Sequence, residues 1–193
     1  MEKSKNQMLN SDWESLIDKW KKLHSEGSFE LATQFYYDEL FDIVVERFKD
    51  NFSLSRDQET LISLLGFSPE PIILTAKALN PKNHYIITTK NIDNFEKINE
   101  YLDFKPIIKN VEENDFSRIY NTLNEIVVDH PTRNITIDIT GGKKSMVSTA
   151  SIFARDFGSQ LIYVDFDVYL KDFRKPLPGT EKLVFSYRPQ FLE

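Results

Sequence analysis

Apolar residues recur along the chain with two different spacings, and the change of spacing divides it into two parts. From Trp13 to about residue 50 they recur every three or four positions, which is typical of amphipathic helices. We predict one helix from Ser11 or Asp12 to about Gly27, and a second helix that starts at Ser28. The aromatic stripe of this helical hairpin packs within its own domain or against a partner. The first alternative is favoured, because amphipathic helices normally supply core.

From Thr60 on, short apolar and β-branched runs alternate with segments of helical spacing. This order predicts a Rossmann-like, doubly wound α/β fold, in which a mostly parallel sheet has helices on both faces. Pro106 indicates an edge strand, because proline has no N–H to donate to a neighbour. We therefore divide the chain into an N-terminal helical hairpin with its linker, 1–58, and a Rossmann-like domain, 59–193. The predicted strands are Thr60–Phe67, His84–Thr89, Phe104–Val111, Asn134–Thr140, Leu161–Val168 and Leu183–Tyr187.

The composition excludes several classes of protein. The 193 residues include no cysteine, which rules out disulfides and thiolate metal sites. No apolar run approaches the ~20 residues needed to cross a bilayer, and the start of the chain lacks the apolar centre of a secretory signal. We expect a cytoplasmic protein with no membrane partner. The net charge of −6 argues against long nucleic acid as a partner, since that usually needs a broad basic face.

One stretch, Ile135–Ser145, combines the features of an anion-binding corner. Its first half alternates β-branched residues with Thr and Asp as a buried strand does, and Gly141 and Gly142 then break the pattern. Lys143 and Lys144 begin a predicted helix. A strand, a glycine turn and a helix start aim free backbone N–H groups and the helix dipole at an anion. Lysines at that position oppose the dipole and need a compensating anion.

A second unusual stretch follows the first predicted strand. Ser68 is the predicted N-cap of the next helix, Pro69 its first residue, and Glu70 a carboxylate that complements the helix dipole. Ligands of doubly wound sheets bind beyond the carboxyl ends of the strands, where the strand order reverses. If both stretches flank that point, they line one crevice. Two known nucleotide loops do not fit, because Ile137 replaces the first glycine of a P-loop and only Gly66 of the dinucleotide fingerprint is present.

The motif Asp-Ile-Thr-Gly-Gly-Lys-Lys-Ser, which ends at Ser145, follows a first strand that ends Gly-Phe-Ser-Pro-Glu-Pro. Together these motifs resemble the CARF (CRISPR-associated Rossmann fold) family, over about Thr60–Tyr187. The family often has threonine where this chain has Lys143. The resemblance implies a homodimer that binds a cyclic oligoadenylate, most often cyclic tetra-adenylate, across its two-fold axis in type III CRISPR antiviral defence.

Most candidate ligand residues have a structural alternative. The glycines let the backbone reach phosphate oxygens or only form a tight turn, and the lysines contact phosphate or are solvated. Thr140 and Ser145 offer hydroxyls to the ligand or cap the helix, and Phe67 stacks on an adenine or packs in the core. Asp138 is expected to orient the glycine loop, because it would repel an anion. The candidate ligand-binding residues are Phe67, Ser68, Pro69, Glu70, Thr89, Thr140, Gly141, Gly142, Lys143, Lys144 and Ser145.

We expect a sensor that binds the cyclic oligoadenylate and acts through the N-terminal helices on an effector domain or protein. The alternative is a ring nuclease that cleaves the ligand without metal, by attack of a ribose 2′-OH, with Lys143 or Lys144 as the catalytic candidates. No histidine is placed as a base, and Asp165 and Asp167 lack a third ligand, so no metal or cofactor is expected. A regulator of another nucleotide or a protein-interaction scaffold is the third possibility.

Overall fold

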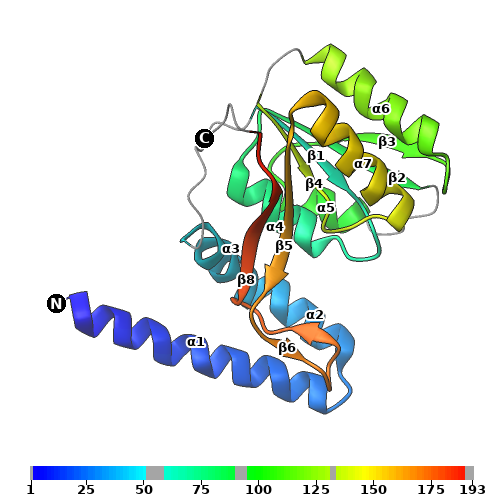
Figure 1. The fold of residues 1–193 in the computed structure, drawn as a ribbon. Coiled ribbons are helices and arrows are strands. Elements are labelled where there is room, and N and C mark those ends of the chain that lie inside the picture. The colour runs from blue at the N-terminus through cyan, green and yellow to red at the C-terminus, as the bar shows by residue number, and fades with distance from the viewer. Residues whose placement is uncertain (1, 51–58, 90–94, 131–133, 190–193) are drawn as a thin grey trace. The chain divides into compact units, whose positions relative to one another are not determined.

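The chain divides into two compact units. The first contains Met1–Asn51 with Phe166–Lys182, and the second contains Phe52–Asp165 with Leu183–Glu193. No helix within the described ranges has the length and apolar character that a membrane span requires. The computed structural model (Figure 1) describes residues 2–50, 59–89, 95–130 and 134–189, with the backbone alone for 2–11.

The first unit is a helical hairpin packed against a short antiparallel β-hairpin. Helix α1 covers Glu2–Ser25, and the chain then turns at Gly27, whose φ of +76° lies in the left-handed region that favours glycine. The second arm starts at Phe29, which agrees with the helix predicted after Ser28. It contains one π-helical segment that the sequence pattern did not predict. The other elements of this unit are α2 (Phe29–Phe35), η1 (Tyr36–Leu40), α3 (Phe41–Asp50), β6 (Tyr169–Leu170) and β7 (Lys175–Pro176).

The core of the first unit joins segments far apart in the sequence. Ile17, Trp20 and Phe35 are buried, and Phe173, between β6 and β7, packs against them. The rings of Trp20 and Phe173 meet edge to face, with 6.1 Å between their centroids. No periodicity of the sequence connected the β6–β7 segment with the N-terminal helices.

The start of α1 is a correction to the sequence analysis. Ser11 and Asp12 are not N-caps, because the helix begins at Glu2. The residues before Ser11 are mostly good helix formers and include neither glycine nor proline. Helix propensity therefore extends the element beyond the apolar stripe on which the prediction rested.

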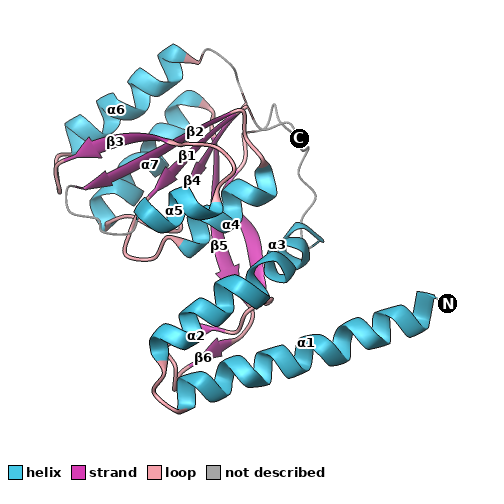
Figure 2. Ribbon diagram, turned by 180° about the vertical axis from the view of Figure 1, so that it is seen from behind, coloured by secondary structure: helices cyan, strands magenta, loops and turns pink. Residues whose placement is uncertain are grey.

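The second unit is built on a six-stranded sheet with the order β3-β2-β1-β4-β5-β8 (Figure 2). The pairs β1–β2, β1–β4, β2–β3 and β4–β5 are parallel, which confirms the predicted Rossmann-like architecture. Strand β3, which follows Pro106, is an edge strand as expected. The strands are β1 (Thr60–Leu64), β2 (Asn83–Thr89), β3 (Ile107–Val111), β4 (Ile135–Asp138), β5 (Gln160–Phe166) and β8 (Glu181–Tyr187).

Helices cover both faces of this sheet (Figures 1 and 2). On one face, Leu123 and Met146 from two neighbouring helices pack with Ile62 and Ile137 of the central strands. The strand order reverses between β1 and β4, because β1 leads to β2 on one side and β4 leads to β5 on the other. The helices are α4 (Glu70–Leu79) and α5 (Phe95–Tyr101) on one face, and α6 (Phe116–Asp129) and α7 (Lys144–Phe157) on the other.

Candidate functional site

Two loops meet at the point where the strand order reverses. Strands β1 and β4 are parallel neighbours, so the β1–α4 and β4–α7 loops leave the same edge of the sheet. A Cβ built on Gly66 would lie 3.0 Å from the backbone nitrogen of Gly142 and 3.4 Å from Cα of Gly141. The loops therefore pack backbone against backbone. The two sequence motifs share one edge, as predicted.

This packing accounts for both glycines of the second loop. A Cβ on Gly141 would lie 2.8 Å from the backbone nitrogen of Gly66 and closer still to the carbonyl oxygen of Leu64. Gly142 has φ of +81°, and its Cβ would lie 2.9 Å from Cβ of Leu64. Close approach to β1 is thus a sufficient reason for each glycine, whatever the loop binds.

Asp138 and Thr140 fix the conformation of the glycine loop. The carboxylate of Asp138, only 1% exposed, accepts hydrogen bonds from the backbone N–H of Thr140 at 2.9 Å and from its hydroxyl at 2.5 Å. Burial raises the pKa of Asp138, and the hydrogen bonds from Thr140 act in the opposite direction. The Thr140 hydroxyl also accepts from the backbone N–H of Val164 on β5, at 2.8 Å. Asp138 therefore orients the loop, as expected, and the Thr140 hydroxyl is used inside the protein.

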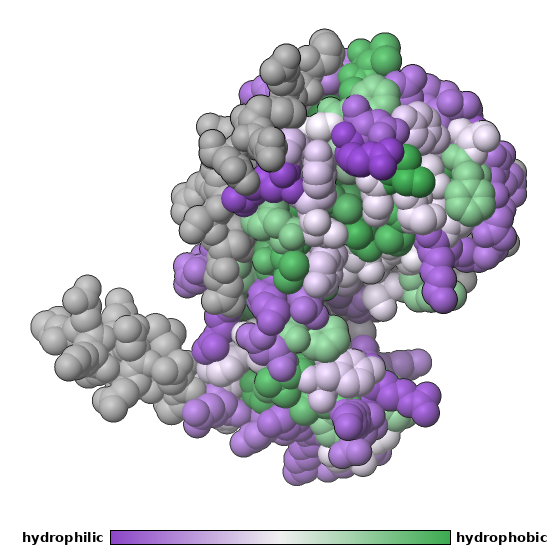
Figure 3. Space-filling view, in the orientation of Figure 1, coloured by the Kyte–Doolittle hydropathy of each residue, from purple (hydrophilic) through white to green (hydrophobic). Residues whose placement is uncertain are grey.

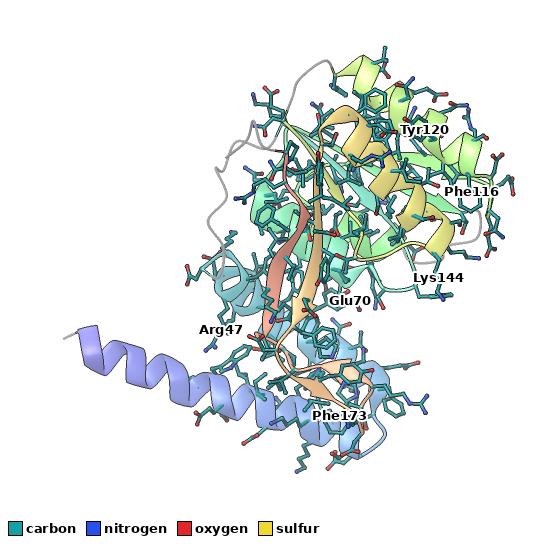
Figure 4. The ribbon with its side chains drawn as sticks, in the orientation of Figure 1. Arg47, Glu70, Phe116, Tyr120, Lys144 and Phe173 are labelled. Atoms are coloured by element: carbon teal, nitrogen blue, oxygen red, sulfur yellow. The ribbon has the colours of Figure 1, made fainter. Side chains whose placement is uncertain are left out.

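The two lysines at the start of α7 have different surroundings. Lys143 is the N-cap, and its half-exposed ammonium forms an ion pair with Glu113 of the β3–α6 loop. Lys144 is the first helical residue, is exposed, and has no ion pair among the described residues. Figure 4 shows Lys144 and Glu70 at the carboxyl edge of the sheet. Among the described residues, the protein supplies the anion that a lysine needs beside a helix N-terminus for Lys143 and not for Lys144.

Ser145 contributes a buried hydroxyl to the first turn of α7. Its side chain is 6% exposed, and its Oγ has no hydrogen-bond partner within the described structure. The carbonyl oxygen of Ser145 accepts from the hydroxyl of Thr149 at 2.7 Å, so that interaction does not involve Oγ. A buried hydroxyl beside free helix N–H groups is suited to donate to an anion.

The β1–α4 loop presents an aromatic ring to solvent. Phe67 is 93% exposed, which excludes core packing. Ser68 is also exposed and is not the predicted N-cap, because α4 begins at Glu70 with Pro69 as its cap. Glu70 is half-buried in the first turn of α4, and Thr89 is half-buried at the end of β2.

Two residues at this edge were missed by the sequence analysis, Glu113 and Phe116. Phe116 opens α6 (Figure 4) and is 54% exposed. A signal for both was present, because an acidic run and an aromatic residue directly follow a predicted strand. The proximity of Glu113 to Lys143 could not be read from the sequence, because it depends on the packing of α6 beside α7.

The two histidines of the second unit, His84 and His130, lie away from these loops. His84 is buried in the amino-terminal half of β2, with Nε2 3.0 Å from the hydroxyl of Ser63. His130 follows the last turn of α6, and its Nε2 lies 2.7 Å from the hydroxyl of Tyr85. Within the described ranges, no group of three or more His, Cys, Asp or Glu residues is arranged to hold a metal ion.

No protein-family model matches the sequence. The chain is 27% identical over 130 residues to the CRISPR system endoribonuclease Csm6 of Thermus thermophilus, a match that covers 63% of this chain and 28% of that protein. Among solved structures, it is similar to Enterococcus italicus Csm6 bound to cyclic hexa-2′-fluoro-hexa-dAMP, with a TM-score of 0.52 and 14% identity over 70% of this chain and 44% of that one. Can2 from Sulfobacillus thermosulfidooxidans, in complex with cyclic tetra-adenylate, gives a TM-score of 0.49 and 21% identity over 61% of this chain and 36% of that one. The chain thus spans less than half the length of each of these proteins.

Proposed function

Because the chain belongs to the CARF (CRISPR-associated Rossmann fold) family, we propose that it senses a cyclic oligoadenylate, with cyclic tetra-adenylate as the expected ring. The observation that carries this proposal is the contact between the β1–α4 and β4–α7 loops where the strand order reverses. Doubly wound sheets bind their ligands at that point. The relative named Csm6 and the six-unit ring bound in the Enterococcus italicus structure support a cyclic oligoadenylate as the class of ligand. The four-unit ring is part of the proposal.

The chemistry of the two loops suits a phosphodiester that carries a base. The start of α7 offers backbone N–H groups, the ammonium of Lys144 and the buried hydroxyl of Ser145 to phosphate oxygens. Phe67 offers an exposed ring on which an adenine can stack, an interaction worth about 1–3 kcal/mol per base. Phosphate and base are thus recognised by neighbouring loops.

We propose further that the chain binds the ring as a homodimer. Two copies related by a two-fold axis present two identical sites, which match a ring with its own two-fold symmetry. Exposed apolar side chains at the carboxyl edge, Phe67 and Phe116, give a second copy apolar surface to bury. Figure 3 shows apolar patches among polar side chains on the second unit. Sedimentation equilibrium should give twice the mass of the chain, and a monomer with and without ligand would contradict this proposal.

The proposed output runs through the first unit. That unit has a core of its own, formed by the N-terminal helices and the β6–β7 segment. We propose that rearrangement of the dimer in type III CRISPR antiviral defence acts through these helices on an effector domain or protein. This chain matches only part of each longer relative, so the existence of an effector is itself part of the proposal.

Calorimetric titration tests the ligand. We expect sub-micromolar affinity for cyclic tetra-adenylate and weaker binding of linear tetra-adenylate. A titration with cyclic hexa-adenylate tests the ring size. Replacing Lys143 and Lys144 together by Ala removes two charge-assisted contacts, so binding should weaken by at least about 10-fold. The control is Lys105→Ala, which removes an exposed lysine before the opposite end of β3 and should leave the affinity unchanged. Absence of binding of every oligoadenylate would contradict the proposal.

The same samples separate sensing from ring cleavage. In cleavage without metal, the ribose 2′-oxygen would bond to the adjacent phosphorus while the P–O5′ bond breaks. The proton lost by the 2′-OH would pass to the departing 5′-oxygen, which leaves a 2′,3′-cyclic phosphate and a 5′-OH, with charge stabilised by Lys143 or Lys144. Incubation of cyclic tetra-adenylate with excess protein in EDTA, followed by chromatography, detects linear products. An intact ring after many hours identifies a sensor, and linear products that disappear with the double Ala variant identify a ring nuclease.

A further inference from the structure

One ion pair joins two loops that the sheet keeps apart. Lys143 precedes α7 and Glu113 precedes α6, and their charged groups are in contact. Strand β3 lies three positions from β4 in the sheet, so the strand order alone does not bring these loops together. They meet because α6 and α7 pack on the same face, where Leu123 and Met146 belong to one core, and because both helices start at the carboxyl edge.

Glu113 is held by a well-defined turn. The carboxylate of Asp115 accepts from the backbone N–H of Arg118 at 2.9 Å and so caps α6. The backbone N–H of Asp115 donates to the carbonyl of Glu112 at 3.3 Å, which closes the turn around Glu113. Asn114 adopts φ of +65°, a conformation that asparagine tolerates better than most residues. This turn fixes the backbone of Glu113 beside the start of α7, where its carboxylate meets the ammonium of Lys143.

A ligand phosphate at the start of α7 would meet this carboxylate at the same ammonium group. Without ligand, Glu113 supplies the negative charge that Lys143 needs beside the positive end of the helix. When a phosphate arrives, two anions compete for one cation, and the carboxylate repels the phosphate until it moves away. Lys144 has no such competitor within the described ranges. A phosphate must therefore displace a carboxylate to contact Lys143, but not to contact Lys144.

We propose that Glu113 is an intramolecular competitor of the ligand phosphate at Lys143 and thereby sets the affinity of the site. Binding exchanges the carboxylate for a phosphate oxygen and releases the β3–α6 turn from α7. The inference rests on the proposed function, because it concerns the same phosphate site. It assigns to Glu113 an effect opposite to that of every contact residue, since its removal strengthens binding.

Titration of three proteins with cyclic tetra-adenylate at one low salt concentration tests the proposal. Glu113→Gln keeps the size of the side chain and removes its charge, so binding should become about two- to five-fold tighter, the range expected for release of a half-exposed ion pair. Glu112→Gln is the matched control, because it removes the same charge from the same turn, and the gain should be clearly smaller. Equal effects of the two variants, or weaker binding by Glu113→Gln, would overturn the proposal.

A second pair of variants shows whether Glu113 acts through Lys143. In a Lys143→Gln background the competition no longer exists, so adding Glu113→Gln should leave the affinity unchanged. A gain as large as in the wild-type background would overturn the proposal, because Glu113 would then act by general repulsion. If the wild type binds and Glu113→Gln gains nothing, the competitor role alone is wrong. If neither the wild type nor any variant binds, the proposed function fails together with it.

Discussion

At the scale of single residues, the hydroxyls of Thr140 in the β4–α7 loop and Ser145 in α7 differ in their capacity to hydrogen-bond a ligand. Thr140 donates to Asp138 and accepts from the backbone N–H of Val164, so its hydroxyl is already used. The hydroxyl of Ser145 is buried and has no hydrogen-bond partner in the described structure. Leaving such a group unpaired costs about 1–3 kcal/mol. A phosphate that accepts from Ser145 removes this cost, so Ser145 is the hydroxyl that we expect to contact the ligand.

His84 makes the stability of the second unit depend on acid. Burial lowers the pKa of His84 to about 3, from 6.5. The unfolded chain therefore binds a proton at its histidine below about pH 6.5, while the folded protein does not. Stability contributed by the neutral imidazole is present above pH 6.5 and is lost as the pH falls towards 3. Between pH 7 and 5 the loss from this group is about 2 kcal/mol in the free energy of unfolding.

Urea denaturation at pH 7 and pH 5 measures this effect. His84→Gln has no titratable group and can still reach the hydroxyl of Ser63, so the variant should lose about 2 kcal/mol less than the wild type between the two pH values. His130→Gln is the control, since His130 is only partly buried and lies outside the sheet. An equal acid dependence of wild type and His84→Gln would show that this imidazole is protonated in the folded protein.

At the scale of elements, the contact between the two loops depends on the absence of side chains. A methyl group on Gly141 would overlap backbone atoms of Leu64 and Gly66, which cannot move aside as a flexible side chain can. We expect Gly141→Ala to lower the free energy of unfolding by about 1–3 kcal/mol, because the loops must separate. It should also weaken binding of cyclic tetra-adenylate. Urea denaturation and calorimetric titration measure the two effects.

Gly158→Ala is the matched control for that variant. Gly158 caps the other end of α7 with φ of +64°, so alanine there costs about 1–2 kcal/mol through backbone strain alone. Its affinity for the ring should stay that of the wild type. If both variants lose stability and neither loses affinity, the contact between the loops has no part in binding.

The elements of the second unit could be predicted largely from the sequence, because each strand and helix has a local pattern. Strand β1 ends at Leu64 instead of Phe67, since the chain turns away to let the two glycine-containing loops meet. Ser68 could not be recognised as a non-capping residue, because its spacing to the helix differs by one position from that of a cap. Glu113 could not be placed beside Lys143, because that proximity comes from helix packing across three strand positions.

At the scale of the whole molecule, the first unit has a hydrophobic cluster of its own. Trp20 lies on α1 and is buried against α2 and the β6–β7 segment of the first unit. Trp20→Ala should destabilise that unit by about 3–5 kcal/mol, because a large ring leaves a cavity. If the second unit alone forms the ligand site, the affinity for cyclic tetra-adenylate should stay within about two-fold, the scatter expected between independent sites.

Tryptophan fluorescence measures the unfolding of the first unit in this variant. The variant retains one tryptophan, Trp13, which lies against Gly179 and under the guanidinium of Arg47 in the first unit. Urea should shift its emission at a lower concentration than in the wild type. Glu14→Ala, on the exposed side of the same helix, should leave the transition unchanged. Loss of ring affinity in step with the unfolding of the first unit would show that this unit takes part in binding.

The first unit combines two segments of the sequence, and the second of them, Phe166–Lys182, interrupts the second unit. The polypeptide therefore crosses between the units three times. A shortened protein that began at residue 59 would still carry the β6–β7 segment but would lack the helices that bury Phe173 (Figure 4). Such a fragment would expose an apolar surface and would be prone to aggregation. Phe166 ends β5 and Glu181 begins β8, so both belong to the six-stranded sheet. Any recombinant version meant to isolate the ring-binding half must therefore replace the β6–β7 segment between these two residues with a short polar connector, as well as remove the amino-terminal helices.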